Sequence, residues 1–133
     1  MEIKCARCGE INSFFDDEVD QVIITDNEGI ILYVNQSMLD ATGYSLSEVI
    51  GQTPGVWGGH MSKQFYKDLW HKIKDKKQVA TFEVLNKKKN GETYKAILRI
   101  SPILDVNSKP SMFLGIETKV NKDGKAVKAK KTK

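Results

Sequence analysis

The chain has 133 residues, a formal net charge of +4 and 40% apolar residues, enough for one domain with a core but not for two. It contains no apolar run of the ~18–20 residues that a membrane-spanning helix needs. Residues 1–18 are polar and acidic, without the apolar stretch of a signal peptide. We therefore expect a cytoplasmic protein that is not inserted in a membrane.

The positive charge is concentrated at the C-terminus. From Lys119 onward, seven lysines and one aspartate give +6, which leaves −2 for residues 1–118. Residues 119–133 have almost nothing apolar to bury, so we expect a disordered, solubilising tail. Lysines can neutralise phosphates, but this segment lacks arginine and aromatic residues, so nucleic-acid binding is not expected.

Residues 22–35, with the sequence VIITDNEGIILYVN, predict a β-hairpin. Two apolar, largely β-branched runs flank a turn at Asp26–Gly29, and Gly29 is able to adopt a positive φ. The residues that follow predict two short helices. Asn35 stands at the N-cap of the first, which Gly43 ends, and Ser45 or Ser47 begins the second.

The second half of the chain predicts one longer helix and three strands. Ser62 can cap a helix over 63–76. The apolar face of that helix comprises Phe65, Tyr66, Leu69, Trp70 and Ile73. Strands are predicted at 79–86, 94–104 and 111–118, the first two joined by a turn at Asn90-Gly91. This order predicts an α+β fold with a five-stranded antiparallel sheet and its helices on one face.

Five successive segments resemble the PAS sensor-domain family, in particular its S-box type. They read ITDNEGIILYVNQSM, GYSLSEVIGQTP, FYKDLWHKI, KKNGETY and SPILDVNSKPSMFLGI. The resemblance covers residues 20–118 and implies a PAS-like sensor domain there. It leaves an N-terminal segment at 1–19 with a C-x-x-C motif, and the lysine-rich tail at 119–133.

The resemblance implies a pocket between the sheet and the longer helix, and an outer sheet face that docks partners. The sequence shows no catalytic set, because neither His60 nor His71 stands in a motif that activates a nucleophile, and no phosphate-binding loop is present. We therefore expect a non-catalytic sensory and protein-interaction module of signal transduction. It would act by ligand-biased dimerisation, or by docking on a separate signalling protein, with Phe14, Phe15 and Val19 as a candidate contact.

The expected pocket lining is almost wholly apolar, which provides no polar anchor from which to name a ligand. Our candidates are Leu32, Asn35, Met38, Trp57, Phe65, Leu69, Ile73, Phe82, Leu98 and Met112. Asn35 is a helix cap first and a pocket donor second.

We expect first that the pocket holds no cofactor. The alternatives are a small hydrophobic ligand, FAD or haem. Trp57 resembles an aromatic residue of flavin-binding relatives, although it can equally be a core residue. Residues 51–61 contain no cysteine, which excludes the covalent flavin photochemistry of the light-sensing branch. For haem, His60 is the candidate ligand, because His71 should face water.

Cys5 and Cys8 form the motif C-x-x-C-G, which has the shape of one zinc knuckle. A tetrahedral zinc site needs four ligands and the chain has two cysteines, so the site would require a second chain or a histidine. Reduced, unused thiols and a reversible disulfide are the alternatives.

Overall fold

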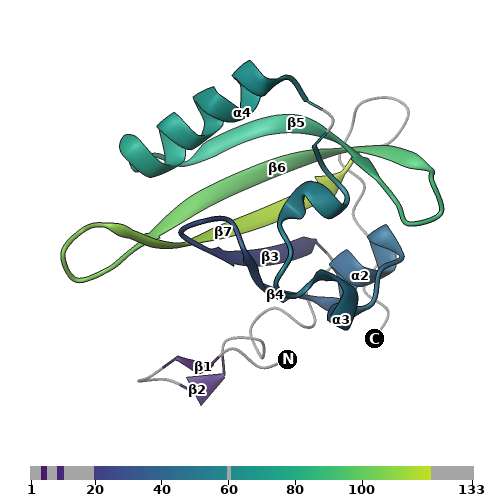
Figure 1. Cartoon of the computed structure of the whole chain (residues 1–133), viewed down its shortest axis with the longest axis horizontal. Coiled ribbons are helices and arrows are strands. Elements are labelled where there is room, and N and C mark those ends of the chain that lie inside the picture. The colour runs from purple at the N-terminus through teal and green to yellow at the C-terminus, as the bar shows by residue number, and fades with distance from the viewer. Residues whose placement is uncertain (1–3, 6–8, 11–19, 60, 121–133) are drawn as a thin grey trace.

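The computed structural model describes residues 20–59 and 61–120 in full, and residues 4–5 and 9–10 by their backbone (Figure 1). Its elements are β1 (Lys4–Cys5), β2 (Gly9–Glu10), β3 (Gln21–Asp26), β4 (Ile31–Val34), α2 (Gln36–Thr42), α3 (Leu46–Val49), η1 (Pro54–Val56), α4 (Lys63–Trp70), η2 (His71–Asp75), β5 (Ala80–Lys87), β6 (Thr93–Leu104) and β7 (Pro110–Lys119). Within this described part, every helix is too short or too polar to traverse a lipid bilayer.

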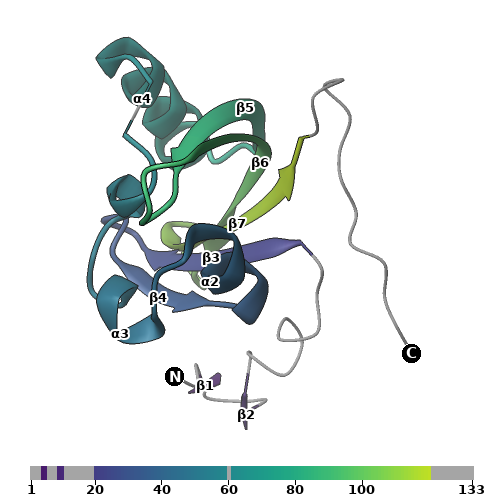
Figure 2. The ribbon, with the colours of Figure 1, turned by 90° about the vertical axis from the view of Figure 1, so that its right-hand side faces the viewer.

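The main sheet has five antiparallel strands in the order β4-β3-β7-β6-β5. The last of the described strands, β7, is therefore the central one of this sheet, and it joins the β3–β4 hairpin to β6. Figure 2 shows α2, α3 and α4 on the same side of this sheet. The α+β prediction of a five-stranded antiparallel sheet with helices on one face is confirmed.

The turn of the β3–β4 hairpin depends on the side chain of Asp26 and on the conformation of Gly29. Oδ1 of Asp26 accepts hydrogen bonds from the backbone N–H groups of Glu28 (2.8 Å) and Ile30 (2.9 Å). Gly29 has φ of 85°, and a Cβ there would lie 3.3 Å from the ring of Trp70. The turn therefore needs glycine for its conformation and for its contact with α4.

Helix α2 is capped by Asn35 at its N-terminus and by Gly43 at its C-terminus, as predicted. Oδ1 of Asn35 accepts from the N–H of Met38, while Gly43 adopts the left-handed conformation with φ of 80°. Helix α3 begins with a capping box of Ser45 and Glu48. Glu48 also accepts from Nζ of Lys89 at 2.6 Å, and these hydrogen bonds lower its pKa to about 2. The pair joins α3 to the β5–β6 turn.

Helix α4 begins at Ser62, whose hydroxyl oxygen accepts from the N–H of Phe65 at 3.1 Å. The helical run continues through η2 as a wider π-helical turn, so the prediction of helix over 63–76 is confirmed apart from this change of pitch. His71 is exposed and pairs with Asp75 at 3.0 Å, as expected for a residue that faces water.

The C-terminal meander of β5, β6 and β7 forms the larger part of the sheet. Gly91, with φ of 96°, closes the β5–β6 turn. Oδ1 of Asp105 accepts from the N–H groups of Asn107 and Lys109 in the β6–β7 turn. Strand β7 extends through Lys119, and the N–H of Val120 donates to the carbonyl of Lys95. The sheet thus continues past the expected domain boundary at 118, because Ala96 of β6 still pairs with Lys119.

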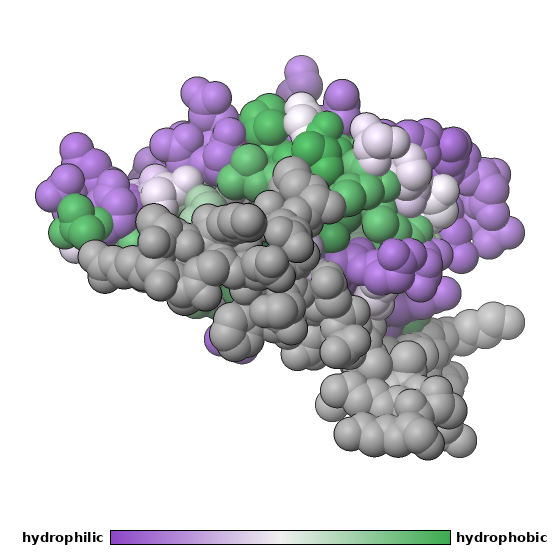
Figure 3. All heavy atoms as spheres, turned by 90° about the horizontal axis from the view of Figure 1, so that it is seen from below, coloured by the Kyte–Doolittle hydropathy of each residue, from purple (hydrophilic) through white to green (hydrophobic). Residues whose placement is uncertain are grey.

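Alternation along the strands divides the apolar residues between two faces. Ile23, Ile31, Val34, Met38, Val49 and Trp57 form a buried cluster beneath the short helices. Val22, Ile24 and Tyr33 form a separate cluster on the opposite face, with Met112, Leu114 and Ile116 packed against them. The surface viewed from below carries a hydrophobic area with hydrophilic residues at its margin (Figure 3).

Candidate functional site

A cavity of about 440 Å³ lies between the helix-bearing face of the sheet and the helical segments. Its walls come from four strands, η1 with the residues after it, and the α4–η2 helix. The lining residues include Ile23 and Thr25 of β3, Glu28 of the β3–β4 turn, Phe82 and Asn86 of β5, Leu98 of β6, Phe113, Gly115 and Glu117 of β7, and Trp57, Tyr66, Leu69, Trp70 and Ile73 of the helical side. This volume is within the usual range of ~300–1,000 Å³ for small-molecule sites.

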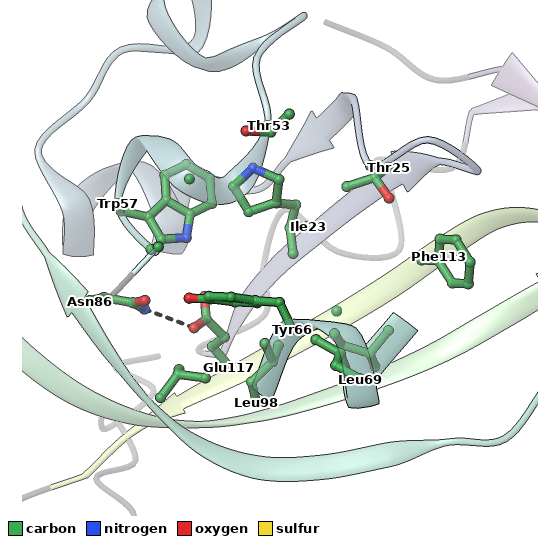
Figure 4. Close-up of a pocket in the computed structure, with 18 of the residues that line it drawn as sticks. Ile23, Thr25, Thr53, Trp57, Tyr66, Leu69, Asn86, Leu98, Phe113 and Glu117 are labelled. Carbon is green, nitrogen blue, oxygen red and sulfur yellow. Dashed lines mark hydrogen bonds between the residues drawn. The ribbon is translucent and has the colours of Figure 1, made fainter. Parts of the chain in front are cut away.

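Aromatic side chains form much of the cavity wall (Figure 4). Trp70 and Phe113 meet edge to face with ring centroids 5.4 Å apart. Trp57 is 2% exposed and lies at the other end, where its carbonyl oxygen accepts from the N–H of Lys87 at 2.7 Å. Such walls favour a flat or apolar ligand.

One end of the cavity is polar. Nδ2 of Asn86 donates to Oε1 of Glu117 at 2.8 Å, a hydrogen bond drawn in Figure 4. The two side chains are 3% and 2% exposed. Nδ2 of Asn86 also lies 3.4 Å from the hydroxyl oxygen of Tyr94, whose own O–H donates to Oε1 of Gln21 at 3.0 Å. A buried network therefore crosses the sheet from β5 to β3.

Burial perturbs the two acidic groups of this network. Desolvation raises the pKa of Glu117 to about 7, against its ordinary value of 4.5, although the hydrogen bond from Asn86 opposes the shift. Burial raises the pKa of Tyr94 as well, and the nearby Glu117 adds to that effect. Tyr94 is accordingly neutral near pH 7, whereas the charge of Glu117 changes there.

Gly115 lies beside the polar end and keeps the cavity open. A Cβ at this position would lie 2.8 Å from Cγ2 of Ile23 and 3.4 Å from Cδ1 of Leu98. The backbone φ of Gly115 is not positive, so the restriction is steric rather than conformational.

Five of the residues predicted to line a pocket do lie on this cavity. They are Trp57, Leu69, Ile73, Phe82 and Leu98. The others lie elsewhere, for reasons of local geometry. Met38 is fully buried in the cluster beneath the short helices, and Phe65 stacks edge to face on Phe82 with centroids 4.9 Å apart. Both fill the core beside the cavity instead of facing it.

Strand geometry explains why Met112 and Leu32 do not line the cavity. Met112 alternates with Phe113 on β7, so it packs on the opposite face. A register shift between Ile24 and Thr25 interrupts the alternation of the hairpin, and Ile31 rather than Leu32 joins the cluster beneath the helices.

Asn35 also lies outside the cavity, because its side chain makes hydrogen bonds to the backbone of β3, of α2 and of the residue before β3. Oδ1 accepts from the N–H groups of Val22 (2.9 Å) and Met38 (3.0 Å), while Nδ2 donates to the carbonyl of Asp20 (2.9 Å). The buried Asn35 side chain therefore links β3 to α2.

The sequence interpretation missed the polar anchors Asn86 and Glu117. A signal was available, because alternation from Phe82 places Asn86 on the same face of β5, and a carboxylate in the apolar stretch of β7 is unusual. What alternation could not show is that the two side chains meet, since β6 lies between their strands.

Several candidates lie outside the described residues. These are His60, Cys8, the side chain of Cys5, and Phe14, Phe15 and Val19. The backbone of the C-x-x-C-G motif is described at its ends, where β1 and β2 pair and Cys5 is opposite Gly9. Across the part of the chain that is described, three or more histidine, cysteine, aspartate or glutamate residues do not gather in a metal-binding group.

The fold and the cavity define a small α+β domain of the sensory type, in which a sheet and short helices enclose a ligand-sized space. The family model of the PAS fold matches residues 9–119, and the chain belongs to this family.

Three relatives illustrate the similarity. A blue-light-activated histidine kinase of Brucella anthropi is 28% identical over 102 residues, which are 76% of this chain and 21% of that protein. A light-oxygen-voltage domain solved in work on a flavin analogue is 27% identical, with a TM-score of 0.69 and coverage of 78% and 79%. A PAS domain from Colwellia psychrerythraea is 23% identical, with a TM-score of 0.74 and coverage of 83% and 93%. The chain spans about a fifth of the length of the curated relatives that it matches.

Proposed function

We propose that the chain is a non-catalytic sensory and protein-interaction module of signal transduction, which changes its association when a small ligand enters the cavity. The observation that carries this proposal is the cavity of about 440 Å³, with aromatic walls and a single buried polar end formed by Asn86 and Glu117. A closed core would need no such space, and the polar end can orient an incoming molecule.

The proposed output is a homodimer or a complex with a separate signalling protein. The face opposite the cavity supports this proposal, since Met112, Leu114 and Ile116 are only partly buried there. These residues alternate along β7 with Phe113, Gly115 and Glu117 of the cavity. One strand therefore connects the ligand to the contact surface.

A non-covalently bound flavin is the second candidate, favoured by the position of Trp57 at the polar end and by the likeness to a light-oxygen-voltage domain. The described residues that line the cavity include no cysteine, and residues 51–61 contain none either. The flavin of this second candidate would be held without a covalent bond to any of these residues.

The test is an absorption spectrum and a mass analysis of the small molecules released from the protein as purified, followed by sedimentation with and without the identified molecule. A ligand that shifts the oligomeric state, or the affinity for a partner, supports the proposal. A flavin spectrum selects the second candidate. If the cavity is empty as purified and added flavin, haem and aromatic ligands neither bind nor alter association, the proposal is wrong.

A further inference from the structure

The carboxylate of Glu117 has an unused hydrogen-bonding position inside the cavity. Oε1 accepts from Nδ2 of Asn86 at 2.8 Å, and Oε2 has no hydrogen-bond partner among residues 20–59 and 61–120. The side chain is 2% exposed, so bulk water has little access to this oxygen. A buried acceptor without a donor costs free energy, and a ligand that donates a hydrogen bond to it removes that cost.

Asn86 presents a second unused acceptor next to it. Its two amide hydrogens point to Glu117 and to the hydroxyl oxygen of Tyr94, at 2.8 and 3.4 Å. Its Oδ1 has no partner within the same described residues. Above pH 7, where Glu117 is ionised, the carboxylate fixes the orientation of the amide, because the opposite orientation would direct oxygen against oxygen. Each of these two lining residues therefore carries an acceptor that has no donor among the described residues.

The charge of the cavity agrees with this pattern of acceptors. Among the described residues that line the cavity there are two carboxylates, Glu117 at the buried end and Glu28 in the exposed hairpin turn, and no lysine or arginine. The five aromatic lining residues also favour cations, since the faces of their rings attract positive charge. These are Trp57, Tyr66, Trp70, Phe82 and Phe113.

We propose that this cavity selects an aromatic ligand carrying a hydrogen-bond-donating head group, preferably a cationic nitrogen, which binds Oε2 of Glu117 and Oδ1 of Asn86. The proposal rests on the proposed ligand-binding function and specifies the chemical class of its ligand. The raised pKa of Glu117 is consistent with a carboxylate that lacks its counter-ion when the cavity is empty. A flavin offers one donor of this kind, its imide N–H, so the second candidate function is compatible with the requirement.

The test uses three ligands that share one ring system and differ only in the head group, titrated calorimetrically at pH 8. They are 2-naphthylmethylammonium, 2-naphthylmethanol and 2-naphthoate. We expect the ammonium compound to bind about tenfold or more tightly than the carboxylate, because it gains a charge-assisted hydrogen bond. The alcohol should be intermediate.

Two variants assign the preference to Glu117. In Glu117→Gln the new Oε1 can still accept from Asn86, and Nε2 replaces the free oxygen with a donor, so the order of the three ligands should invert. Glu83→Gln is the matched control, because Glu83 is an exposed carboxylate of β5 that does not line the cavity. Its Oε1 lies 3.8 Å from Nζ of Lys95. It should keep the wild-type order.

The outcomes separate this proposal from the proposed function. Binding of all three ligands with equal affinity, or an order that Glu117→Gln leaves unchanged, overturns the assignment of Glu117 but leaves a ligand-binding cavity. Absence of binding by all three overturns this proposal, whereas the proposed function is overturned only if flavin and haem also fail to bind. If Glu117→Gln does not fold, the wild-type order still decides, together with the side-chain amide resonance of Asn86, which should shift with the ammonium compound and not with the carboxylate.

Discussion

Asn86 and Glu117 form a 2.8 Å hydrogen bond although their strands, β5 and β7, are not neighbours in the sheet. The side chains reach each other across β6, on the face that bears the helices. This contact sets the polar end of the cavity and buries a carboxyl group whose charge changes near neutral pH.

The stability of the protein should fall between about pH 4.5 and pH 7, because the pKa of Glu117 is raised to about 7 from its ordinary 4.5. Over that interval the folded chain keeps a proton that the unfolded chain has lost, so the contribution is complete below pH 4.5 and is lost as pH rises through 7. The size of the effect is about 3 kcal/mol. Urea unfolding of the wild type and of Glu117→Gln, from pH 4.5 to 8, measures it.

Glu117→Gln should remove this decline and be the more stable protein at pH 8, while Glu83→Gln should follow the wild type. A wild-type curve that is flat over the same interval, or one that Glu117→Gln does not flatten, would show that Glu117 ionises normally.

Asn35→Ala should be strongly destabilising, because it removes three hydrogen bonds where β3 meets α2, two of them buried and one partly buried. We expect a loss of about 2–4 kcal/mol in the free energy of unfolding. Ser62→Ala is the matched control, since Ser62 is an exposed helix cap whose side chain accepts one hydrogen bond. This variant should lose only about 1 kcal/mol in the free energy of unfolding. Equal losses of unfolding free energy in the two variants would contradict the role of Asn35 in linking β3 to α2. Denaturant titration provides both values.

Gly115→Ala should destabilise the protein by about 1–3 kcal/mol through overpacking, because its Cβ would lie 2.8 Å from Cγ2 of Ile23. It should also weaken binding of the naphthalene ligands, since the new methyl group enters the cavity. In an Ile23→Ala background the added cost of Gly115→Ala should largely vanish. Additive losses in this double-mutant cycle would show that the two side chains do not interact.

Trp57→Ala should enlarge the cavity and lower the free energy of unfolding by about 3–5 kcal/mol, because this ring is 2% exposed and packs in the cluster beneath the short helices. Trp57→Phe should lose less and keep ligand binding. Thermal and urea unfolding measure both variants, and the fluorescence of Trp70 remains as the folding signal. An Ala variant as stable as the wild type would place Trp57 outside the core.

Local chemistry in the sequence was sufficient to predict the five strands of the main sheet, the helices α2, α3 and α4, and their order, but it did not predict β1, β2 or η1. Asn35 and Gly43 bound α2, Ser62 begins α4, and the glycine turns close the hairpins, because capping and turn formation depend on residues a few positions apart. The family was recognisable for the same reason, since its motifs are local signals in a fixed order. The prediction for Leu32 failed because a local rule was interrupted: the register shift beside Thr25 changes which side chains of β4 face the helices. The prediction for Met112 failed although alternation holds along β7, because Met112 lies on the face opposite the cavity.

The sequence by itself determined the PAS fold: a hairpin, capped helices and a meander with one apolar face for the helices. Only the tertiary structure decided which residues meet in the cavity. Asn86 and Glu117 are 31 positions apart and lie on non-neighbouring strands, so no periodicity could pair them. The physical reason is that side-chain period fixes a residue's face, whereas contact across a sheet depends on strand order and register, which the packing of the whole chain sets.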